Sequence, residues 1–457
     1  MKALFTQRDS RNMPRRSHLP PARIIAMSFA AAILVGTFLL ALPWAHAEGQ
    51  QVSLLEALFT ATSAVCVTGL IVVDTGSAFN HFGQTVIMLL IKLGGLGVVT
   101  FGAVFAMVLG ERLGYSQRMR AAEALSALQV GGIITLVRRI LLLSLGLELL
   151  ATALLSLHFM PRYGWLRGGF FALFHSISAY NNAGFSLYSD SLESAVANPL
   201  IILTLASLFI IGGLGFVVQI NILQHMRSPR SIPLLLHSKI VLLSTIFLCV
   251  AGFVLITLLE WRNPATLEPL SFGGKLLAGF FQGVTPRTAG FNSIAYGAMH
   301  ETSILLTILL MFIGGSPGST AGGVKTVTFF VIFAMTWSLM RGRDDLTLFH
   351  RRITVHAAVK AGVVVVLSMV IVTSALIALR MSNGNLPFLA VAFETFSAFA
   401  TVGLSFGITA ELNTPSRLIV MLLMYLGRVG PLTLALALVQ SRQRSSLKYP
   451  QDVVIIG

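Results

Sequence analysis

The sequence has few charged residues and very few cysteines. Of its 457 residues, only 11% are Asp, Glu, Lys or Arg, whereas 55% are hydrophobic and the mean hydropathy is +0.83. Soluble globular proteins typically contain about 25% charged residues. This composition excludes an ordinary soluble protein and indicates a chain that lies in a lipid bilayer. Cys66 and Cys249 both lie in apolar stretches, so neither a disulfide framework nor a cysteine metal site is expected.

Motifs that would support catalysis are also missing. The ten His residues show no HExxH pattern or clustered spacing, no set of Ser, His and Asp stands out, and the chain has neither a Walker motif nor a GxGxxG loop. The GGVKT stretch at residues 322–326 resembles a Walker fragment only superficially, because it is embedded in an apolar segment with no strand before it. We therefore expect no enzyme activity and no cofactor, and any control by a nucleotide must come from another subunit.

The chain instead contains one short stretch four times. In each copy an aromatic residue lies ten positions before a glycine, and the copies are Phe59 to Gly69, Phe174 to Gly184, Phe280 to Gly290 and Phe393 to Gly403. An apolar segment with a second glycine cluster follows each copy, and these clusters are Gly94 with Gly95, Gly212 with Gly213, Gly314 with Gly315, and Gly427 with Gly430. Similarity at a regular spacing indicates an internal repeat.

The lengths of the apolar runs suggest how each repeat meets the membrane. A run of about 18 residues or more crosses a hydrocarbon core of about 30 Å, but the runs just before the repeated glycines are too short. The sequence predicts an all-α membrane protein of four pseudo-symmetric span/pore-loop/span repeats, with eight transmembrane helices and four re-entrant pore helices around one central pore. The second span of each repeat is expected at about 81–109, 198–224, 302–340 and 414–439.

The expected parts follow the chain in order. They are a cytoplasmic N-terminal tail at 1–21, repeat 1 at 22–109 with its pore loop at 53–72, repeat 2 at 138–226 with its pore loop at 168–187, repeat 3 at 237–340 with its pore loop at 272–293 and an intramembrane loop at 314–325, repeat 4 at 356–440 with its pore loop at 386–406, and a cytoplasmic C-terminal tail at 441–457.

Basic residues divide between the two sides of this arrangement. The segments on the side of both termini carry 22 of the 32 Lys and Arg residues, and those on the opposite side carry six. By the positive-inside rule both termini are cytoplasmic, the protein lies in the plasma (inner) membrane, and the short segments enter from outside. Because the net charge of +15 is distributed in this way, it does not indicate a nucleic-acid partner. Four basic residues remain at membrane depth: Lys92, Arg287, Lys325 and Arg428.

Four re-entrant turns in one chain predict a path for a cation. Non-helical backbone at membrane depth is tolerated only where protein or a water-filled cavity satisfies its amides, so we expect the turns to meet around one axis. Short helices that enter from outside point their partially negative C-terminal ends at that axis. Carbonyl oxygens before each glycine can replace the hydration shell of an alkali ion, and glycine permits the positive φ that this arrangement needs.

The predicted filter consists of the four residues that end at each repeated glycine. A competing explanation is that the glycines only let helices pack closely, and we apply it to Gly94-Gly95-x-Gly97 and Gly212-Gly213-x-Gly215. Close packing does not require a half-length helix before each glycine, so it does not explain the first set. The predicted filter residues are Cys66, Val67, Thr68, Gly69, Asn181, Asn182, Ala183, Gly184, Arg287, Thr288, Ala289, Gly290, Ala400, Thr401, Val402 and Gly403.

The loop sequences VCVTGL, NNAGF, PRTAGF and ATVGL, together with GGSPGSTAGGVKT, carry a family resemblance. The chain resembles, over nearly its whole length, the potassium-transporter superfamily that includes the Trk, Ktr and HKT proteins, and within it the KtrB-type membrane subunits. Each loop keeps one glycine where the TVGYG pattern of potassium channels has two, so a simpler filter with fewer strong sites is expected. The resemblance implies potassium uptake, passive or coupled to sodium as a symport, and a potassium ion at the filter as the only bound metal.

The resemblance also implies partners. It implies a homodimer with one pore in each protomer, embedded in membrane lipid. It further implies a cytosolic ring of nucleotide-binding regulatory subunits, of KtrA-like type, that docks against the basic inner face.

A second feature of the third repeat is a run of helix breakers between two strongly apolar flanks. Glycine and proline break helices, so we expect a flexible loop across the pore beneath the filter, and the resemblance implies that this loop is the gate. A short cytoplasmic loop is the alternative, but the flanking runs are then too short to cross the membrane. The predicted gate residues are Gly314, Gly315, Ser316, Pro317, Gly318, Ser319, Thr320, Ala321, Gly322, Gly323, Lys325 and Arg428.

Single charges at membrane depth suggest further roles, because a charge there normally faces a cavity or a partner. We expect Arg428 to contact the gating loop or to repel the permeating cation, with a snorkelling, packing role as the alternative, and Lys325 to be able to swing toward the cytoplasm. Lys92 is expected at a subunit or lipid boundary. Arg287 is expected to brace its loop by bonding carbonyls or by pairing with an acid such as Glu394, and not to line the ion path.

Two acids lie on the short helices, namely Glu56 and Glu394. They either add negative field at the outer mouth or serve in capping and pairing. A rival function of another class is an ion-coupled carrier for organic solutes built from inverted repeats. It is disfavoured because all four predicted repeats have the same orientation.

Overall fold

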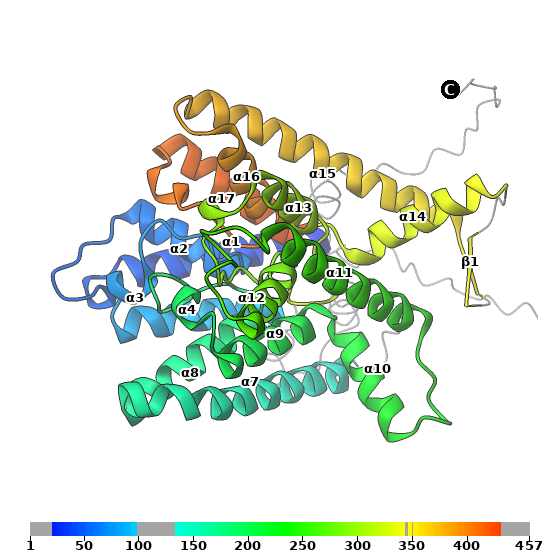
Figure 1. Ribbon diagram of the computed structural model, residues 1–457, viewed down its shortest axis with the longest axis horizontal. Coiled ribbons are helices and arrows are strands. Elements are labelled where there is room, and N and C mark those ends of the chain that lie inside the picture. Colours follow the sequence, from blue (N-terminus) through cyan, green and yellow to red (C-terminus); the bar gives the residue numbers. More distant parts are fainter. Residues whose placement is uncertain (1–20, 98–132, 343–345, 350, 431–457) are drawn as a thin grey trace, which may run out of the picture.

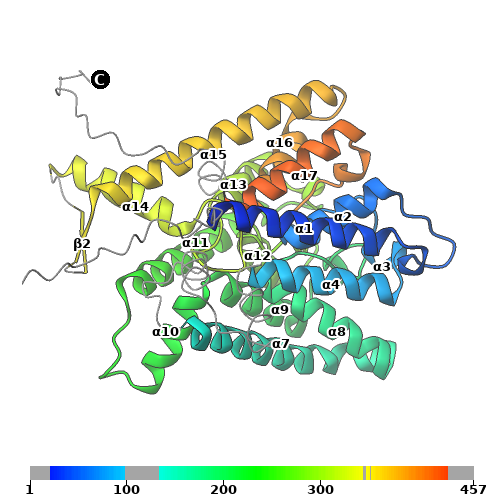
Figure 2. The same cartoon turned by 180° about the vertical axis from the view of Figure 1, so that it is seen from behind.

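A computed structural model describes residues 21–97, 133–342, 346–349 and 351–430 of the chain. The described part is mostly helical, and we group its helices into four units, one for each predicted repeat (Figure 1). Helices α7 (Ile133–Tyr163) and α8 (Trp165–Tyr180) lie at one side. Helices α15 (Val355–Ser382), α16 (Phe388–Ala400) and α17 (Thr414–Val429) lie at the opposite side, and the view from behind shows the same arrangement (Figure 2). The predicted tails and the ends of the predicted spans at 98–109 and 431–439 lie outside the described residues.

A long apolar helix opens each unit. Several of its side chains face away from the protein, including Leu149 at 61%, Phe247 at 68% and Val366 at 64% exposure. Large apolar groups in such number on outward helix faces are suited to contact with lipid. These helices are α1 (Pro21–Ala41), α7 (Ile133–Tyr163), α11 (Leu236–Glu260) and α15 (Val355–Ser382).

A half-length helix follows in each unit, as the repeat predicts. The first of these begins with a capping box in which Ser53 and Glu56 bond reciprocally, an arrangement that satisfies free N–H groups at a helix start. Of the alternatives for Glu56, the structure therefore shows capping. The four helices are α2 (Leu54–Cys66), α8 (Trp165–Tyr180), α12 (Phe272–Val284) and α16 (Phe388–Ala400).

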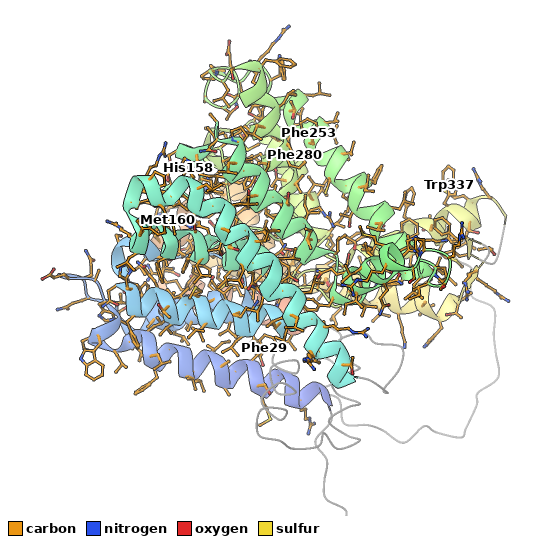
Figure 3. All side chains as sticks on the ribbon, turned by 90° about the horizontal axis from the view of Figure 1, so that it is seen from below. Phe29, His158, Met160, Phe253, Phe280 and Trp337 are labelled. Carbon is orange, nitrogen blue, oxygen red and sulfur yellow. The ribbon has the colours of Figure 1, made fainter. Side chains whose placement is uncertain are left out.

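One buried phenylalanine anchors each half-length helix in the core. Phe59, Phe174 and Phe393 are at most 1% exposed, as the repeat suggests. In the third unit the equivalent buried residue is Phe281 and not Phe280. Phe280 instead lies edge to face with Phe253 of α11, their ring centroids 5.9 Å apart (Figure 3). In the third copy the buried aromatic residue therefore lies nine positions before the glycine, and not ten as in the other copies.

The second helix of each unit ends at or near its second glycine cluster. Three of these helices begin after an asparagine whose side chain accepts hydrogen bonds from the first-turn amides: Asn80, Asn198 and Asn413. Such residues are favoured N-caps. The helices are α4 (His81–Leu96), α9 (Pro199–Gly213) with α10 (Phe216–Arg227), α13 (Glu301–Phe312) with α14 (Thr326–Met340), and α17 (Thr414–Val429).

The prediction of one continuous second span at 198–224 is wrong. Helices α9 and α10 meet at 102°, because Gly215 adopts a φ of +92° that ends one helix and redirects the next. Gly97 and Gly430 adopt nearly the same conformation, with φ of 79° and 90° and ψ of 141° and 133°. The break at 314–325 between α13 and α14 was predicted and is present.

Few of the described helices are long enough to cross a membrane by themselves. Three qualify by length and composition, or four when the bent pair α9 and α10 is counted as one span. The half-length helices and the separate pieces of the broken helices are too short to qualify. The remaining elements are α3 (Thr75–Ala78), η1 (Pro43–Ala45), η2 (Glu193–Ala195), η3 (Tyr296–Ala298), η4 (Ile408–Glu411), and the antiparallel pair β1 (Leu346–Leu348) and β2 (Arg351–Ile353) beyond α14.

Candidate functional site

The four half-length helices end in loops that share one backbone conformation. In each loop the residue two positions before the repeated glycine has a positive φ, as does the glycine itself. Positive φ is strained for residues with a side chain, most of all for β-branched ones, and such strain is concentrated at functional sites. The non-glycine residues are Val67 (56°), Asn182 (57°), Thr288 (72°) and Thr401 (50°), and the glycines are Gly69 (96°), Gly184 (68°), Gly290 (81°) and Gly403 (91°).

The four loops touch one another in a closed ring. A Cβ atom added to Gly69 would lie 2.4 Å from the carbonyl oxygen of Ala183, and one added to Gly184 would lie 2.8 Å from the Cα of Gly290. The ring continues in the same way: a Cβ on Gly290 would lie 2.3 Å from the Val402 carbonyl oxygen, and one on Gly403 would lie 2.0 Å from that of Thr68. No side chain fits at these positions, so the loops that the sequence places far apart do meet around one axis.

Hydroxyl groups on the half-length helices hold the loops. The Gly69 amide donates to Ser63 Oγ at 3.0 Å and the Gly403 amide donates to Ser397 Oγ at 3.1 Å. Ser178 Oγ donates to the Phe185 carbonyl at 2.7 Å, and Thr285 Oγ1 to the Phe291 carbonyl at 2.5 Å. Sequence reasoning missed these residues, although a signal exists, because each hydroxyl lies four residues after the buried phenylalanine.

A second set of polar side chains lies one position after that phenylalanine and bonds the segment beyond the glycine. His175 Nε2 lies 3.1 Å from Ser186 Oγ, and Gln282 Oε1 accepts from the Ser293 amide at 3.2 Å. Glu394 Oε1 accepts from the hydroxyls of Ser405 and of Thr409. Glu394 is 1% exposed, so it braces the loop through these two hydroxyl groups, which is neither helix capping nor pairing with a basic residue.

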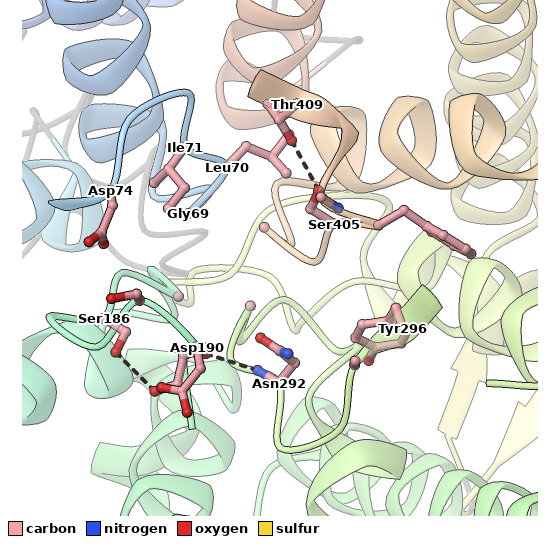
Figure 4. A pocket seen from close by; sticks show the side chains of 18 of the residues that line it. Gly69, Leu70, Ile71, Asp74, Ser186, Asp190, Asn292, Tyr296, Ser405 and Thr409 are labelled. Carbon is pink, nitrogen blue, oxygen red and sulfur yellow. Dashed lines mark hydrogen bonds between the residues drawn. The ribbon is translucent and has the colours of Figure 1, made fainter. Parts of the chain in front are cut away.

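A cavity of about 660 Å³ lies on one side of the ring, and all four repeated glycines line it. Three carboxylates, Asp74, Asp190 and Glu193, also line it, all from the first two repeats (Figure 4). Burial, and to a smaller extent the charge of Asp190, raises the pKa of Glu193. A hydrogen bond of 2.7 Å from Asn292 Nδ2 to Glu193 Oε1 acts in the opposite direction and lowers this pKa. The cavity is therefore an acidic vestibule that leads to the ring.

The loop at 314–325 packs against the opposite side of the ring. Its ends are paired, since the Gly314 amide donates to the Val324 carbonyl at 2.8 Å. A Cβ on Gly322 would lie 1.9 Å from Thr401 Oγ1, and Thr320 Oγ1 donates to Asn182 Oδ1 at 2.9 Å. The loop thus lies against two of the four predicted filter loops, and its place across the pore stays a prediction.

The broken second helices hold this loop in place. The Ser316 amide donates to the Gly213 carbonyl at 3.0 Å, and the Phe216 amide to the Gly318 carbonyl at 2.9 Å. The Arg428 guanidinium donates to the carbonyls of Thr320 and of Gly94. The predicted contact of Arg428 with the loop is confirmed, and the arginine also ties the loop to the first repeat.

Lys325 remains within the loop. Its Nζ donates to the Ala321 carbonyl at 2.7 Å and to the Gly322 carbonyl at 3.4 Å. This ammonium group therefore bonds the loop itself in place of extending toward the cytoplasm.

Gly94 and Gly212 are packing sites, as predicted, and Gly427 is a packing site as well. A Cβ on Gly94 would lie 2.0 Å from the Val65 carbonyl oxygen, one on Gly212 would lie 2.0 Å from that of Tyr180, and one on Gly427 would lie 1.8 Å from that of Phe399. These glycines bring the second helices onto the last turns of the half-length helices.

The remaining two basic residues at membrane depth contact neighbouring helices. The Arg287 guanidinium reaches Thr245 and Cys249 of α11, with Nη1 3.5 Å from the Thr245 carbonyl oxygen, so it braces its loop through a carbonyl and does not pair with Glu394. Lys92 forms an ion pair of 2.5 Å with Glu148 of α7. Its charge therefore has a partner inside the protein, and the placement of Lys92 at a subunit or lipid boundary stays a prediction.

Comparison with known proteins agrees with this geometry. Residues 2–449 match the family model of TrkH, described as a cation transport protein. The chain is 44% identical to Ktr system potassium uptake protein B of Bacillus subtilis (strain 168) over 96% of this chain and 97% of that protein. It is 43% identical to the protein of the same name from Vibrio alginolyticus, over 95% and 94%. The crystal structure of the potassium transporter TrkH from Vibrio parahaemolyticus has a similar fold, with a TM-score of 0.72, 17% identity, and coverage of 94% and 87%. The chain belongs to the TrkH family of cation transport proteins, which are transporters and not enzymes.

Proposed function

We propose that this protein takes up potassium across the plasma membrane through a single pore in each chain. The observation that supports this most is the closed ring of four loops, each with the same pair of positive-φ residues and each on the floor of one acidic vestibule. The half-length helices direct partially negative C-terminal ends at the ring. The carbonyls of residues 66–69, 181–184, 287–290 and 400–403 then replace the water around a potassium ion.

The first prediction is that the chain restores rubidium uptake to potassium-starved cells that lack their own potassium transporters. Uptake measured with and without sodium tests the expected sodium dependence, and competition by organic solutes tests the rival carrier function. Absence of rubidium uptake by a chain that is present in the membrane would contradict the proposal. Uptake of an organic solute in its place would favour the rival.

We further assign the loop at 314–325 as the gate and Arg428 as its latch. Arg428 joins the loop to the first repeat through the Thr320 and Gly94 carbonyls. The second prediction is that Arg428→Gln raises rubidium flux, because a neutral amide holds these carbonyls more weakly than a guanidinium does. Flux into vesicles that contain the purified protein measures this, and the control is Arg417→Gln, whose guanidinium bonds outer-loop carbonyls at residues 410 and 412. A lower flux in folded Arg428→Gln would argue against a latch.

The proposed assembly is a homodimer with both termini in the cytoplasm and a cytosolic nucleotide-binding partner. The relatives' names describe a Ktr system, which implies more than one component. The third prediction is that light scattering in detergent, corrected for bound detergent, gives twice the chain mass of 49.1 kDa. A mass of one chain at every concentration tested would contradict the dimer.

A further inference from the structure

An ion pair lies behind the second pore loop, at membrane depth, and the proposed pore and gate do not use it. Lys92 is on α4 of the first repeat and Glu148 is on α7 of the second, with their charged atoms 2.5 Å apart. The Glu148 side chain is 2% exposed and that of Lys92 is 16% exposed. Ser144 of α7 contacts both, at 2.5 Å from Lys92 Nζ and 3.2 Å from Glu148 Oε1. A charge pair inside an apolar span is costly unless it has a function.

The carboxylate of this pair reaches a predicted filter residue. Glu148 Oε1 accepts a hydrogen bond from Asn181 Nδ2 at 3.1 Å. Asn181 is the C-cap residue that directly follows α8, and it immediately precedes Asn182 with its positive φ. The same nitrogen donates to the Ile177 carbonyl at 2.8 Å, which ties the side chain back to the helix. Glu148 is therefore bonded to the point where the helix becomes the loop.

The surroundings leave the Asn181 side chain little freedom. A Cβ on Gly95 of α4 would lie 2.1 Å from Asn181 Oδ1, so the helix backbone packs directly against the amide. Asn181 Oδ1 has no hydrogen-bond partner among the described residues. The bond to Glu148 is thus the contact from outside α8 that orients this amide.

The loop is held from its other side as well. Thr320 Oγ1 donates to Asn182 Oδ1 at 2.9 Å and to the Tyr180 carbonyl at 3.2 Å. Thr320 belongs to the loop at 314–325, and Glu148 stands behind the filter on α7. The second pore loop is clamped between these two groups.

We propose that Glu148 is a positioning residue for cation selectivity. Through Asn181 it fixes the backbone of residues 181–184, and Lys92, 2.5 Å away, holds the Glu148 side chain in its orientation. This inference rests on the proposed function, in which these residues form one quarter of a filter. A merely structural ion pair would affect how much protein folds, but not which cation passes.

Paired substitutions separate the hydrogen bond from the charge. The double variant Lys92→Met with Glu148→Gln removes both charges and keeps an oxygen that accepts from Asn181. The double variant Lys92→Met with Glu148→Leu removes both charges and the acceptor. The ratio of potassium to sodium permeability is measured in vesicles that contain each purified protein. We expect the Gln double variant to keep the wild-type ratio. We expect the ratio of the Leu double variant to fall by a factor of about two to ten, which is the range that the loss of one hydrogen bond allows.

A matched control is Glu260→Leu, which removes another buried carboxylate. Glu260 accepts from Thr266 Oγ1 at 2.8 Å and from the His300 amide at 3.0 Å, and none of its partners belongs to residues 181–184. Its loss is expected to lower the yield of folded protein and leave the ratio unchanged. If the Glu148→Leu double variant does not assemble, Asn181→Leu removes the same bond from the loop side and is expected to lower the ratio similarly.

Two outcomes would count against the clamp and tell it apart from the filter. In the first outcome, the potassium-to-sodium permeability ratio is unchanged in the Leu double variant or in Asn181→Leu but changed in Gly290→Ser. This result would overturn the role of Glu148 and leave the filter assignment intact. Unchanged ratios in all of these variants would overturn the filter itself.

Discussion

Replacement of Gly290 by Ser is expected to reduce potassium uptake at least about tenfold or to admit sodium. Gly290 has a φ of +81°, a conformation that costs about 1–3 kcal/mol for a residue with a side chain. The added Cβ would also lie 2.3 Å from the Val402 carbonyl oxygen and 2.8 Å from the Cα of Gly184. Because each factor of ten corresponds to about 1.4 kcal/mol, a shift of the ring that relieves this overlap is enough to change the coordination of an ion. Rubidium uptake and the potassium-to-sodium permeability ratio measure the effect.

The matched control for this substitution is Gly49→Ser. Gly49 has a φ of +77°, but a Cβ there would meet nothing within 4 Å. The φ angle is nearly the same, whereas the contact with the ring is absent, so Gly49→Ser should keep both the uptake and the ratio. Wild-type uptake and selectivity in a folded Gly290→Ser protein would show that the ring is not the filter.

Deletion of residues 314–323 is expected to raise cation flux several-fold and to reduce its dependence on a regulatory partner. The paired ends of the loop make this deletion feasible, because Ile313 and Val324 already form a parallel bridge. The deletion removes Thr320 and Gly322, which lie against Asn182 and Thr401 beneath the ring. Flux into vesicles, with and without cytosolic extract that supplies the partner, measures both effects.

A milder variant serves as the control for this deletion. Thr320→Val keeps the loop and removes the hydroxyl that bonds Tyr180 and Asn182. It should raise flux less than the deletion does, because the Arg428 bond to the residue 320 carbonyl remains. A deletion protein that folds and assembles but carries no ions would show that the loop supports the pore and does not close it.

The broad organisation of this chain is visible in its sequence because its causes are local. Apolar run length predicts the half-length helices, and α2, α8, α12 and α16 appear within a few residues of the expected segments. Glycine and proline content predicts the break between α13 and α14. A side-chain-free residue with positive φ is recognisable at Gly69 and its counterparts, because only glycine adopts that conformation without strain.

Other features depend on which segments meet. The 102° bend at Gly215 does not follow from the GGxG pattern when that pattern is taken only as a sign of close helix packing. The ion pair of Lys92 cannot be read from the sequence, because its partner, Glu148, lies 56 residues away in another repeat. The sequence allows several partners for Arg287, and only the packing of α11 shows that its guanidinium reaches the Thr245 carbonyl.

The sequence by itself determined the fourfold repeat, the class of the protein and the positions of the four turns, because hydrophobic length and glycine act within a few residues. Only the tertiary structure decided that the turns close into a ring, that Arg428 joins the central loop to the first repeat, and that a carboxylate of α7 supports the second turn. These contacts join residues far apart in the chain, and their geometry is set by helix packing that no local pattern encodes.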